Sequence, residues 1–266
     1  MKIKVIKTRI LVPPRDDLLG VIKNSLKRIP ERSIFVVTSK VVSIWEGRSI
    51  PKDRFPDKDE LIKKEADKYL PKRFVPGKWI MHTMKHDLFI PSAGVDESNA
   101  DGFYVLWPSR PERAAEILHR WIRKTYRVKN CGVIITDSHT IPLRRGTIGI
   151  SLAHWGFNPL KDYRGTKDIF GRKFTMTQTN IADGLAAAAV VVMGEGREQT
   201  PLALITDIPG VRFIRGVGRS QKSRSPLKIP EKEDLYYPFL SCPPWKKGGG
   251  GVRMKKYMLP EPNSDE

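Results

Sequence analysis

The alternation of apolar and polar residues predicts a chain of short strands and helices in mixed order. Strands are expected at 2–11, 33–42, 79–84, 87–90, 132–136, 146–153 and 201–207. Helices are expected at 15–28, 57–70, 111–126 and 182–193. Because the two kinds of element do not alternate strictly, the pattern predicts an α+β (mixed α/β) fold in which helices pack on mixed sheets.

Three segments carry this prediction most clearly. Residues 33–42 are β-branched and almost continuously apolar, which is typical of a buried strand. Residues 111–126 begin at Pro111, with Ser109 as the expected cap, and repeat apolar side chains at helical spacing. Residues 182–193 form an expected buried helix that ends at Gly194.

The length of 266 residues fits one large domain or two small ones. We expect a core over 1–217, either as one domain or as two interleaved subdomains, followed by a basic C-terminal segment over 218–266. The four consecutive glycines at 248–251 predict a flexible tract within that segment.

Composition excludes several classes of protein. Cys131 and Cys242 are the only cysteines, which excludes a disulfide scaffold and a cysteine-rich zinc module and fits a reducing compartment. No apolar run approaches the roughly 20 residues that a membrane helix needs. The N-terminal residues lack the apolar stretch of a signal peptide. We therefore expect a cytoplasmic protein with no membrane partner.

The net charge of +19 and the pI near 10.0 raise the question of nucleic acid. Residues 211–257 hold twelve Lys or Arg and only three Asp or Glu, so the excess is concentrated there. The aromatic residues interleaved with these charges are Tyr236, Tyr237, Phe239, Trp245 and Tyr257. The simpler interpretation is a solvated basic surface whose aromatic rings pack onto the core, so we do not expect nucleic acid as a partner. A basic protein also suits a polyanionic substrate.

Candidate chemistry begins with two polar segments in the first half of the chain. In Thr38-Ser39-Lys40 a lysine interrupts an apolar run, so its ammonium either meets an anion or reaches solvent. In AGVDESN, at 93–99, Asp96 suits a hard cation and Asn99 a base or a phosphate. The same residue types also make an ordinary turn, and the pattern alone favours the turn.

Two further segments lie in the second half. Asp137 and Ser138 stand side by side at a predicted strand end, an arrangement common at Mg²⁺ sites and equally consistent with a simple turn. Arg144 and Arg145 follow and could neutralise phosphate charge. Residues 193–200, MGEGREQT, form a glycine-containing loop after the last predicted helix. The chain has no Walker A motif and no dinucleotide fingerprint, so any nucleotide site is of another type.

In this order and spacing, these segments resemble the coenzyme F(420)-0:L-glutamate ligase family, the GTP-dependent γ-glutamyl ligases of deazaflavin coenzyme biosynthesis. The resemblance covers roughly 2–207. The stretches that carry it are TSKVVSIWEGR (38–48), AGVDESN (93–99), ITDSHTIPLRRGTIGI (135–150), the block from DYRG to DIFGR (162–172) and IADGLAAAAVVVMG (181–194).

The resemblance implies a mixed α/β fold, a homodimer, GTP as cosubstrate and two divalent cations, Mg²⁺ or Mn²⁺. It implies a reaction that joins the amine of L-glutamate to a carboxylate of the acceptor through an acyl phosphate. One metal would be held by Asp96 and Asp137, and the second would be reached by Ser138 and Glu195. The implied nucleotide contacts are Ser39, Lys40, Asn99, Met193, Gly194 and Gly196. The implied catalytic residues are Asp96, Asp137 and Arg144.

Two alternatives stay open at this point. The acceptor is either F(420)-0 or a folate-like γ-glutamyl chain, because both present the same terminal carboxylate chemistry. A protein of another class, a catalytically lapsed nucleotide- or nucleic-acid-binding protein on the same scaffold, would also account for the basic C-terminal segment.

Overall fold

The computed structural model describes residues 1–214 and 225–254, which form two compact units built from interleaved segments. Unit 1 comprises Met1–Arg9, Leu19–Ser39 and Arg110–Glu233. Unit 2 comprises Ile10–Leu18, Lys40–Ser109 and Asp234–Glu266. Part of the C-terminal segment therefore belongs to each unit, and the expected boundary at 217 stays a prediction. The mixed content of helices and sheets confirms the α+β prediction.

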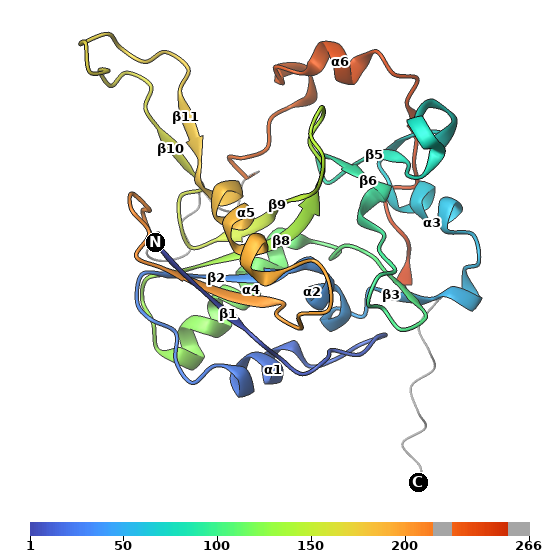
Figure 1. Ribbon diagram of the computed structural model, residues 1–266, viewed down its shortest axis with the longest axis horizontal. Coiled ribbons are helices and arrows are strands. Elements are labelled where there is room, and N and C mark those ends of the chain that lie inside the picture. Colours follow the sequence, from blue (N-terminus) through green and yellow to red (C-terminus); the bar gives the residue numbers. More distant parts are fainter. Residues whose placement is uncertain (215–224, 255–266) are drawn as a thin grey trace. The chain divides into compact units, whose positions relative to one another are not determined.

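Unit 1 is centred on a five-stranded sheet of order β1-β12-β2-β8-β9 (Figure 1). Its strands are β1 (Lys2–Ile6), β2 (Ser33–Thr38), β8 (Cys131–His139), β9 (Ile148–Trp155) and β12 (Leu202–Thr206). The pair β2–β8 is parallel and the other pairs are antiparallel.

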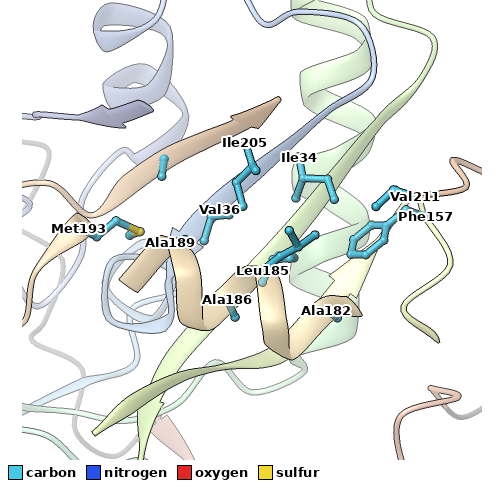
Figure 2. Packing of buried hydrophobic residues seen from close by; sticks show 12 residues of the cluster. Ile34, Val36, Phe157, Ala182, Leu185, Ala186, Ala189, Met193, Ile205 and Val211 are labelled. Carbon is cyan, nitrogen blue, oxygen red and sulfur yellow. The ribbon is translucent and has the colours of Figure 1, made fainter. Parts of the chain in front are cut away.

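Helices cover the sheet of unit 1. The helices are α1 (Leu18–Ser25), of which all but the first residue belongs to unit 1, α4 (Pro111–Tyr126) and α5 (Ile181–Met193). Helix α5 lies over Ile34, Val36 and Ile205, with Leu185 at the centre of the packed cluster (Figure 2). The intervening residue Phe35 is also fully buried, so β2 is covered on both faces. This is why its sequence is continuously apolar rather than alternating.

A long hairpin projects from unit 1 between β9 and α5 (Figure 1). It contains β10 (Leu160–Asp162) and β11 (Gln178–Asn180), which pair antiparallel. The side chain of Asn180 caps α5 by accepting the backbone N–H of Asp183 at 3.0 Å. The last residue of the hairpin is therefore also the N-cap of α5.

Unit 2 is built from smaller elements. A four-stranded sheet has the order β13-β4-β5-β6, and β3 pairs with β7. The strands are β3 (Ser49–Pro51), β4 (Lys68–Leu70), β5 (His82–Lys85), β6 (Leu88–Pro91), β7 (Phe103–Val105) and β13 (Lys246–Lys247). The helices are α2 (Ser39–Trp45), which enters unit 2 after its first residue, α3 (Lys58–Glu65) and α6 (Tyr237–Ser241).

The interior of unit 2 contains a buried charge cluster beside its apolar core. Glu65 at the end of α3 is fully buried and accepts both Arg48 Nη2, at 3.0 Å, and Lys85 Nζ, at 3.0 Å. Burial would raise the pKa of Glu65, but the charges of Arg48 and Lys85 outweigh it and hold the pKa below 4.5. Val252 completes the cluster, since its N–H donates to Glu65 at 2.7 Å and its carbonyl accepts Arg48.

The glycine tract is hydrogen-bonded to α3 and the residues after it, and its expected flexibility stays a prediction. The four N–H groups of residues 248–251 donate to carbonyls of Asp67, Lys63, Ala66 and Lys64, in that order. A Cβ at Gly248 would lie 2.0 Å from the Ala66 carbonyl oxygen, so no larger residue fits there. The tract satisfies carbonyls that the end of α3 leaves without intrahelical partners.

Several element boundaries differ from those predicted. The expected strand at 33–42 ends at Thr38, and Ser39 begins a helix, so Lys40 is helical. Strand β8 runs on to His139, so Asp137 lies inside a strand. Ser109 does not cap α4, because its N–H and hydroxyl donate to Glu46 and the cap position is Arg110. The helix expected at 57–70 ends at Glu65, where the buried charge cluster begins.

No helix among residues 1–214 and 225–254 is long and apolar enough to cross a membrane.

Candidate active site

In unit 2, Lys40 and the 96–99 turn form one cluster of predicted site residues. Lys40 lies in the first turn of α2, and its Nζ is 2.6 Å from Asp96 Oδ2. The same ammonium donates to the carbonyl of Ser98 at 2.6 Å and to its hydroxyl at 2.9 Å. The structure thus joins two segments that are 58 residues apart in the chain.

The carboxylate of Asp96 is held in its charged form. Burial would raise its pKa, but the ammonium of Lys40 and hydrogen bonds from Lys40 and Ser98 lower it further than burial raises it. The Ser98 N–H donates to Oδ1 at 2.8 Å and the Ser98 hydroxyl to Oδ2 at 3.0 Å. A fixed, ionised carboxylate beside a lysine is suited to binding a cation and a phosphate together.

The backbone at Gly94, just before Asp96, lies very close to the side chain of Trp107. At Gly94 the φ angle is +70°, and a Cβ there would lie 2.2 Å from Nε1 of Trp107. Only glycine fits such a position. Asn99 follows the cluster with φ of 49° and an exposed side chain. The segment 93–99 therefore forms the turn that its sequence suggested, and its role as a binding site stays a prediction.

Two lysines missed by the sequence analysis border this cluster. Glu97 is bridged by Lys52 Nζ at 2.8 Å and by Lys58 Nζ at 2.7 Å. Hydrogen bonds from these two lysines lower the pKa of Glu97. No sequence motif marks Lys52 or Lys58. They lie next to the 96–99 turn only because the folded chain brings them to Glu97.

In unit 1, the structure brings Ser138 and Glu195 together. The Ser138 hydroxyl donates to the two carboxylate oxygens of Glu195 at 2.6 and 2.8 Å. The preceding Asp137 accepts the Ser138 N–H at 2.9 Å. The side chains of Ser138 and Glu195 thus meet where β8 approaches the loop after α5, and Asp137 is the neighbouring residue in the strand.

The long β8 positions these side chains. It continues past Thr136 because Asp137 and Ser138 pair with Ile150 and Gly149 on β9. A Cβ at Gly149 would lie 2.6 Å from the Ala186 carbonyl oxygen, so glycine lets β9 approach α5 closely. Because successive strand residues face opposite sides, Asp137 and Ser138 are presented to different faces of the sheet.

The loop 193–200 is folded on itself. Gly194 ends α5 with φ of 81°, and its N–H donates to the Val190 carbonyl. The Glu198 carboxylate accepts the Gly196 N–H at 2.8 Å. Met193 is buried, whereas Gly194 and Gly196 are exposed, so the expected nucleotide contacts of this loop would come from the two glycines.

The two remaining candidates have different surroundings. Ser39 is buried at the start of α2, so any nucleotide contact would be made through its backbone. Arg144 is exposed in the loop between β8 and β9, where its guanidinium is accessible to a phosphate. Lys40, Asp96 and Asn99 belong to unit 2, and the other candidates belong to unit 1.

The donor chemistry fits a hard divalent cation. Asp96 in unit 2, and Asp137, Ser138 and Glu195 in unit 1, all offer oxygen, which Mg²⁺ and Mn²⁺ prefer. Among the described residues, no group of three or more His, Cys, Asp or Glu side chains could by itself hold a metal ion. A metal bound here would therefore take part of its coordination from water and substrate phosphates, as Mg²⁺ commonly does.

Comparison with known proteins identifies the family of the chain. Residues 6–207 match the family model described as F420-0:gamma-glutamyl ligase. The chain is 30% identical over 251 residues to the coenzyme F420:L-glutamate ligase of Methanopyrus kandleri, covering 88% of this chain and 96% of the relative. The Methanocaldococcus jannaschii protein of the same name is 34% identical over 223 residues, covering 78% of this chain and 86% of the relative.

A third relative of the same name, from Methanococcus maripaludis, is 35% identical over 207 residues, covering 72% of this chain and 82% of the relative. The match of the family model spans most of both units and includes every candidate residue named above. The resemblance seen in the sequence motifs is confirmed. The chain belongs to the F420-0:gamma-glutamyl ligase family and is a ligase of that class.

Proposed function

We propose that the protein is a GTP-dependent γ-glutamate ligase that joins L-glutamate to a terminal carboxylate of F(420)-0. The observation that carries the proposal is the cluster of Lys40, Asp96 and Ser98, where an ammonium and an ionised carboxylate are fixed side by side. Family membership supports the ligase class, and the relatives' name supports glutamate as the amine and an F420-type acceptor.

A carboxylate is a poor electrophile, so the reaction needs an activating step. The γ-phosphoryl group of GTP passes to the acceptor carboxylate, which gives an acyl phosphate and GDP. The amine of glutamate then attacks the acyl carbon, forms the amide and releases inorganic phosphate and a proton. Such chemistry depends mainly on positioning phosphates and neutralising their charge.

The residues of this chain divide these tasks. Lys40 is placed to exchange its contact with Asp96 for a phosphate oxygen, and exposed Arg144 can meet the transferred phosphoryl group. As the family resemblance implies, Asp96 and Asp137 would each serve as a ligand of Mg²⁺ or Mn²⁺, and Ser138 with Glu195 would also reach such an ion. When bound, the metals neutralise charge on the phosphates and polarise the transferred group. The exposed glycines of the 193–200 loop and the side chain of Asn99 would contact the nucleotide.

Calorimetric titration of GTP in the presence of Mn²⁺ tests the binding half of the proposal. Asp137→Asn removes a carboxylate charge without changing side-chain size, so metal-dependent GTP binding should be lost while the circular dichroism spectrum is unchanged. Lys40→Met should weaken GTP binding by about tenfold or more, the usual scale for a charge-assisted phosphate contact. Lys2→Met, which removes an exposed lysine paired with Asp207, is the matched control and should have no effect. Unchanged GTP affinity in Asp137→Asn would contradict the metal assignment.

The quaternary state is part of the proposal. We propose a homodimer, as the family resemblance implies. Sedimentation of the purified protein should give twice the chain mass of 30.3 kDa. A monomer at concentrations that support full activity would contradict it.

A further inference from the structure

Two basic segments of unit 1 meet at the edge of the sheet where β2 and β8 begin. They are residues 23–32, KNSLKRIPER, and residues 123–130, RKTYRVKN. Because β2 and β8 are parallel neighbours, with Ser33 opposite Cys131, the residues that precede the two strands lie at the same edge. Ser138 of the candidate site lies near the opposite end of the nine-residue β8. Neither segment belongs to the C-terminal stretch whose charge is prominent in the sequence.

The two segments contain eight cations and one acidic residue, Glu31. We call the eight side chains the basic surface: Lys23, Lys27, Arg28, Arg32, Arg123, Lys124, Arg127 and Lys129. All of them are exposed except Arg123, which is half-buried. The basic surface therefore gathers positive charge from parts of the chain that are about a hundred residues apart.

Glu31 joins the two segments through the backbone. Its carboxylate accepts the N–H of Lys129 at 2.6 Å and the N–H of Asn130 at 2.9 Å. The N–H of the next residue, Arg32, donates to the Asn130 carbonyl at 2.7 Å. The pKa of Glu31 is lowered mainly by the two backbone hydrogen bonds. The single acidic residue thus fixes the frame that carries the cations.

Tyr126 joins the two segments a second time, at the ends of their helices. Its hydroxyl lies 3.2 Å from the carbonyl oxygens of both Ile22 and Leu26, at the end of α1. Its ring is half-buried and meets Trp121 edge-on, with 6.0 Å between the ring centres. The backbone beneath the basic surface is therefore held at two independent places.

The positive charge of the basic surface is not neutralised within the protein. In the part of the chain that the structure describes, residues 1–214 and 225–254, none of the eight cations forms an ion pair. Lys23, Arg123 and Lys124 lie in the last turns of α1 and α4, where the helix dipole favours a cation. The other five lie outside both helices, so the dipole does not explain them. Like charges held this close repel one another, and an anionic partner would relieve the repulsion.

The surroundings of these cations discriminate between anionic partners. Leu26, Ile29 and Val128, the large aliphatic residues of the two segments, are all buried, so the surface has no apolar face to enter a lipid bilayer. Tyr126 is the one aromatic residue of the two segments, and its ring is packed against Trp121. A single strand is held largely by bases stacked on exposed rings, which this surface does not offer. A partner that presents phosphates on its outside, with its bases already stacked, fits best.

We propose that the basic surface binds the phosphate backbone of a double-stranded nucleic acid without reading its sequence. Lysine and arginine contacts to phosphates supply most of such binding, and they position a duplex without distinguishing its bases. The frame is already fixed by Glu31 and Tyr126, so binding orders side chains and leaves the backbone as it is. The ligase reaction does not use this surface, so the two proposals stand or fall separately.

Fluorescence anisotropy of a labelled DNA duplex of mixed sequence, titrated with the full-length protein at several salt concentrations, tests the proposal. The test variant combines Lys27→Gln, Arg28→Gln and Lys129→Gln. Each lost phosphate contact should reduce the slope of log affinity against log salt by about 0.9, so three losses should reduce it by about 2.7. The matched control combines Lys167→Gln, Arg172→Gln and Lys173→Gln in the exposed hairpin of unit 1, which makes the same change in net charge. The control should keep the native slope.

The outcomes separate this proposal from its rivals and from the ligase proposal. Equal slopes in the two triple variants would overturn the proposal, as would a native protein that does not bind the duplex. Tighter binding to the matching single strand, or binding to anionic lipid vesicles in place of the duplex, would also overturn it. The test variant should bind GTP with native affinity in the presence of Mn²⁺, because its three residues lie away from Ser138 at the other end of β8.

Discussion

The two units are stabilised in different ways. In unit 1, α5 packs on a cluster of buried apolar side chains from β2, β8 and β12, and this cluster around Leu185 contains no charge. In unit 2, a fully buried carboxylate is neutralised by two cations and completed by a backbone group from residue 252, far along the chain. The α5 cluster of unit 1 therefore depends on hydrophobic burial, whereas unit 2 adds to its apolar core a few specific contacts between segments far apart in the chain.

The largest expected effect is in the charge cluster of unit 2. Glu65→Gln leaves Arg48 and Lys85 buried without their carboxylate, so it should destabilise the protein by about 3–5 kcal/mol. Chemical denaturation measures this loss. Glu60→Gln, which removes the partner of an exposed Lys63 on the same helix, should cost less than about 1 kcal/mol. Similar losses for the two variants would show that the buried cluster does not stabilise unit 2.

The corresponding change in unit 1 creates a cavity. Leu185→Ala removes buried apolar atoms from the centre of the cluster and should cost about 3 kcal/mol. Val191→Ala on the same helix is the control, because Val191 is 82% exposed and its loss should be within about 0.5 kcal/mol. Equal effects at the two positions would contradict the packing of α5 described here.

Acid should affect unit 1 before unit 2. Burial lowers the pKa of His119 and of His154 from 6.5 to about 4. As the pH falls from 6.5 to about 4, the unfolded chain binds protons that folded unit 1 does not, so stability is lost through this window, by about 3 kcal/mol for each histidine. Glu65 has a lowered pKa, so its contribution persists until the pH falls below 4.5.

Unfolding free energies measured between pH 6.5 and 4 test whether acid destabilises unit 1 before unit 2. His154→Asn should reduce the slope of stability against pH over that range, because one titrating group is removed. His82→Asn, in unit 2, is only half-buried and should change the slope less. A slope unchanged by His154→Asn would exclude that histidine as a source of acid sensitivity.

The smallest expected effects come from two glycines with opposite surroundings. Gly248→Ala forces a Cβ against the Ala66 carbonyl and should destabilise unit 2 by about 2 kcal/mol. At Gly184, within α5, a Cβ meets nothing within 4 Å, so Gly184→Ala should stabilise unit 1 by about 0.5–1 kcal/mol. Thermal unfolding of the two variants compares them, and a stabilised Gly248→Ala would show that the glycine tract does not pack against this carbonyl.

The same contrast explains what the sequence could predict. The strands and helices of unit 1 follow from local patterns, and α4 and α5 were placed to within a residue or two. The hydrogen-bonded glycine tract and the buried Glu65 could not be predicted, because both depend on partners distant in sequence. The change from strand to helix at Ser39 was missed because no proline or glycine interrupts the apolar run there.

The candidate site was predictable only where its residues belong to a local sequence motif. Motif order identified Asp96, Asp137 and Lys40, and the structure adds that Lys40 contacts Asp96 and that Ser138 contacts Glu195. The lysines that bridge Glu97 and the basic surface of unit 1 had no motif to mark them. Such features emerge only when the fold brings separate segments together.

The central claim is that this chain adds glutamate to a carboxylate acceptor at the expense of GTP. The most direct test incubates the protein with GTP, Mn²⁺, L-glutamate and either F(420)-0 or a folate monoglutamate, and reads product masses together with phosphate release. We predict a mass gain of one or more glutamyl residues on F(420)-0, with one phosphate released for each residue added. Tight GTP binding without any mass gain on F(420)-0 would contradict the proposed acceptor, and a gain on the folate alone would reassign it.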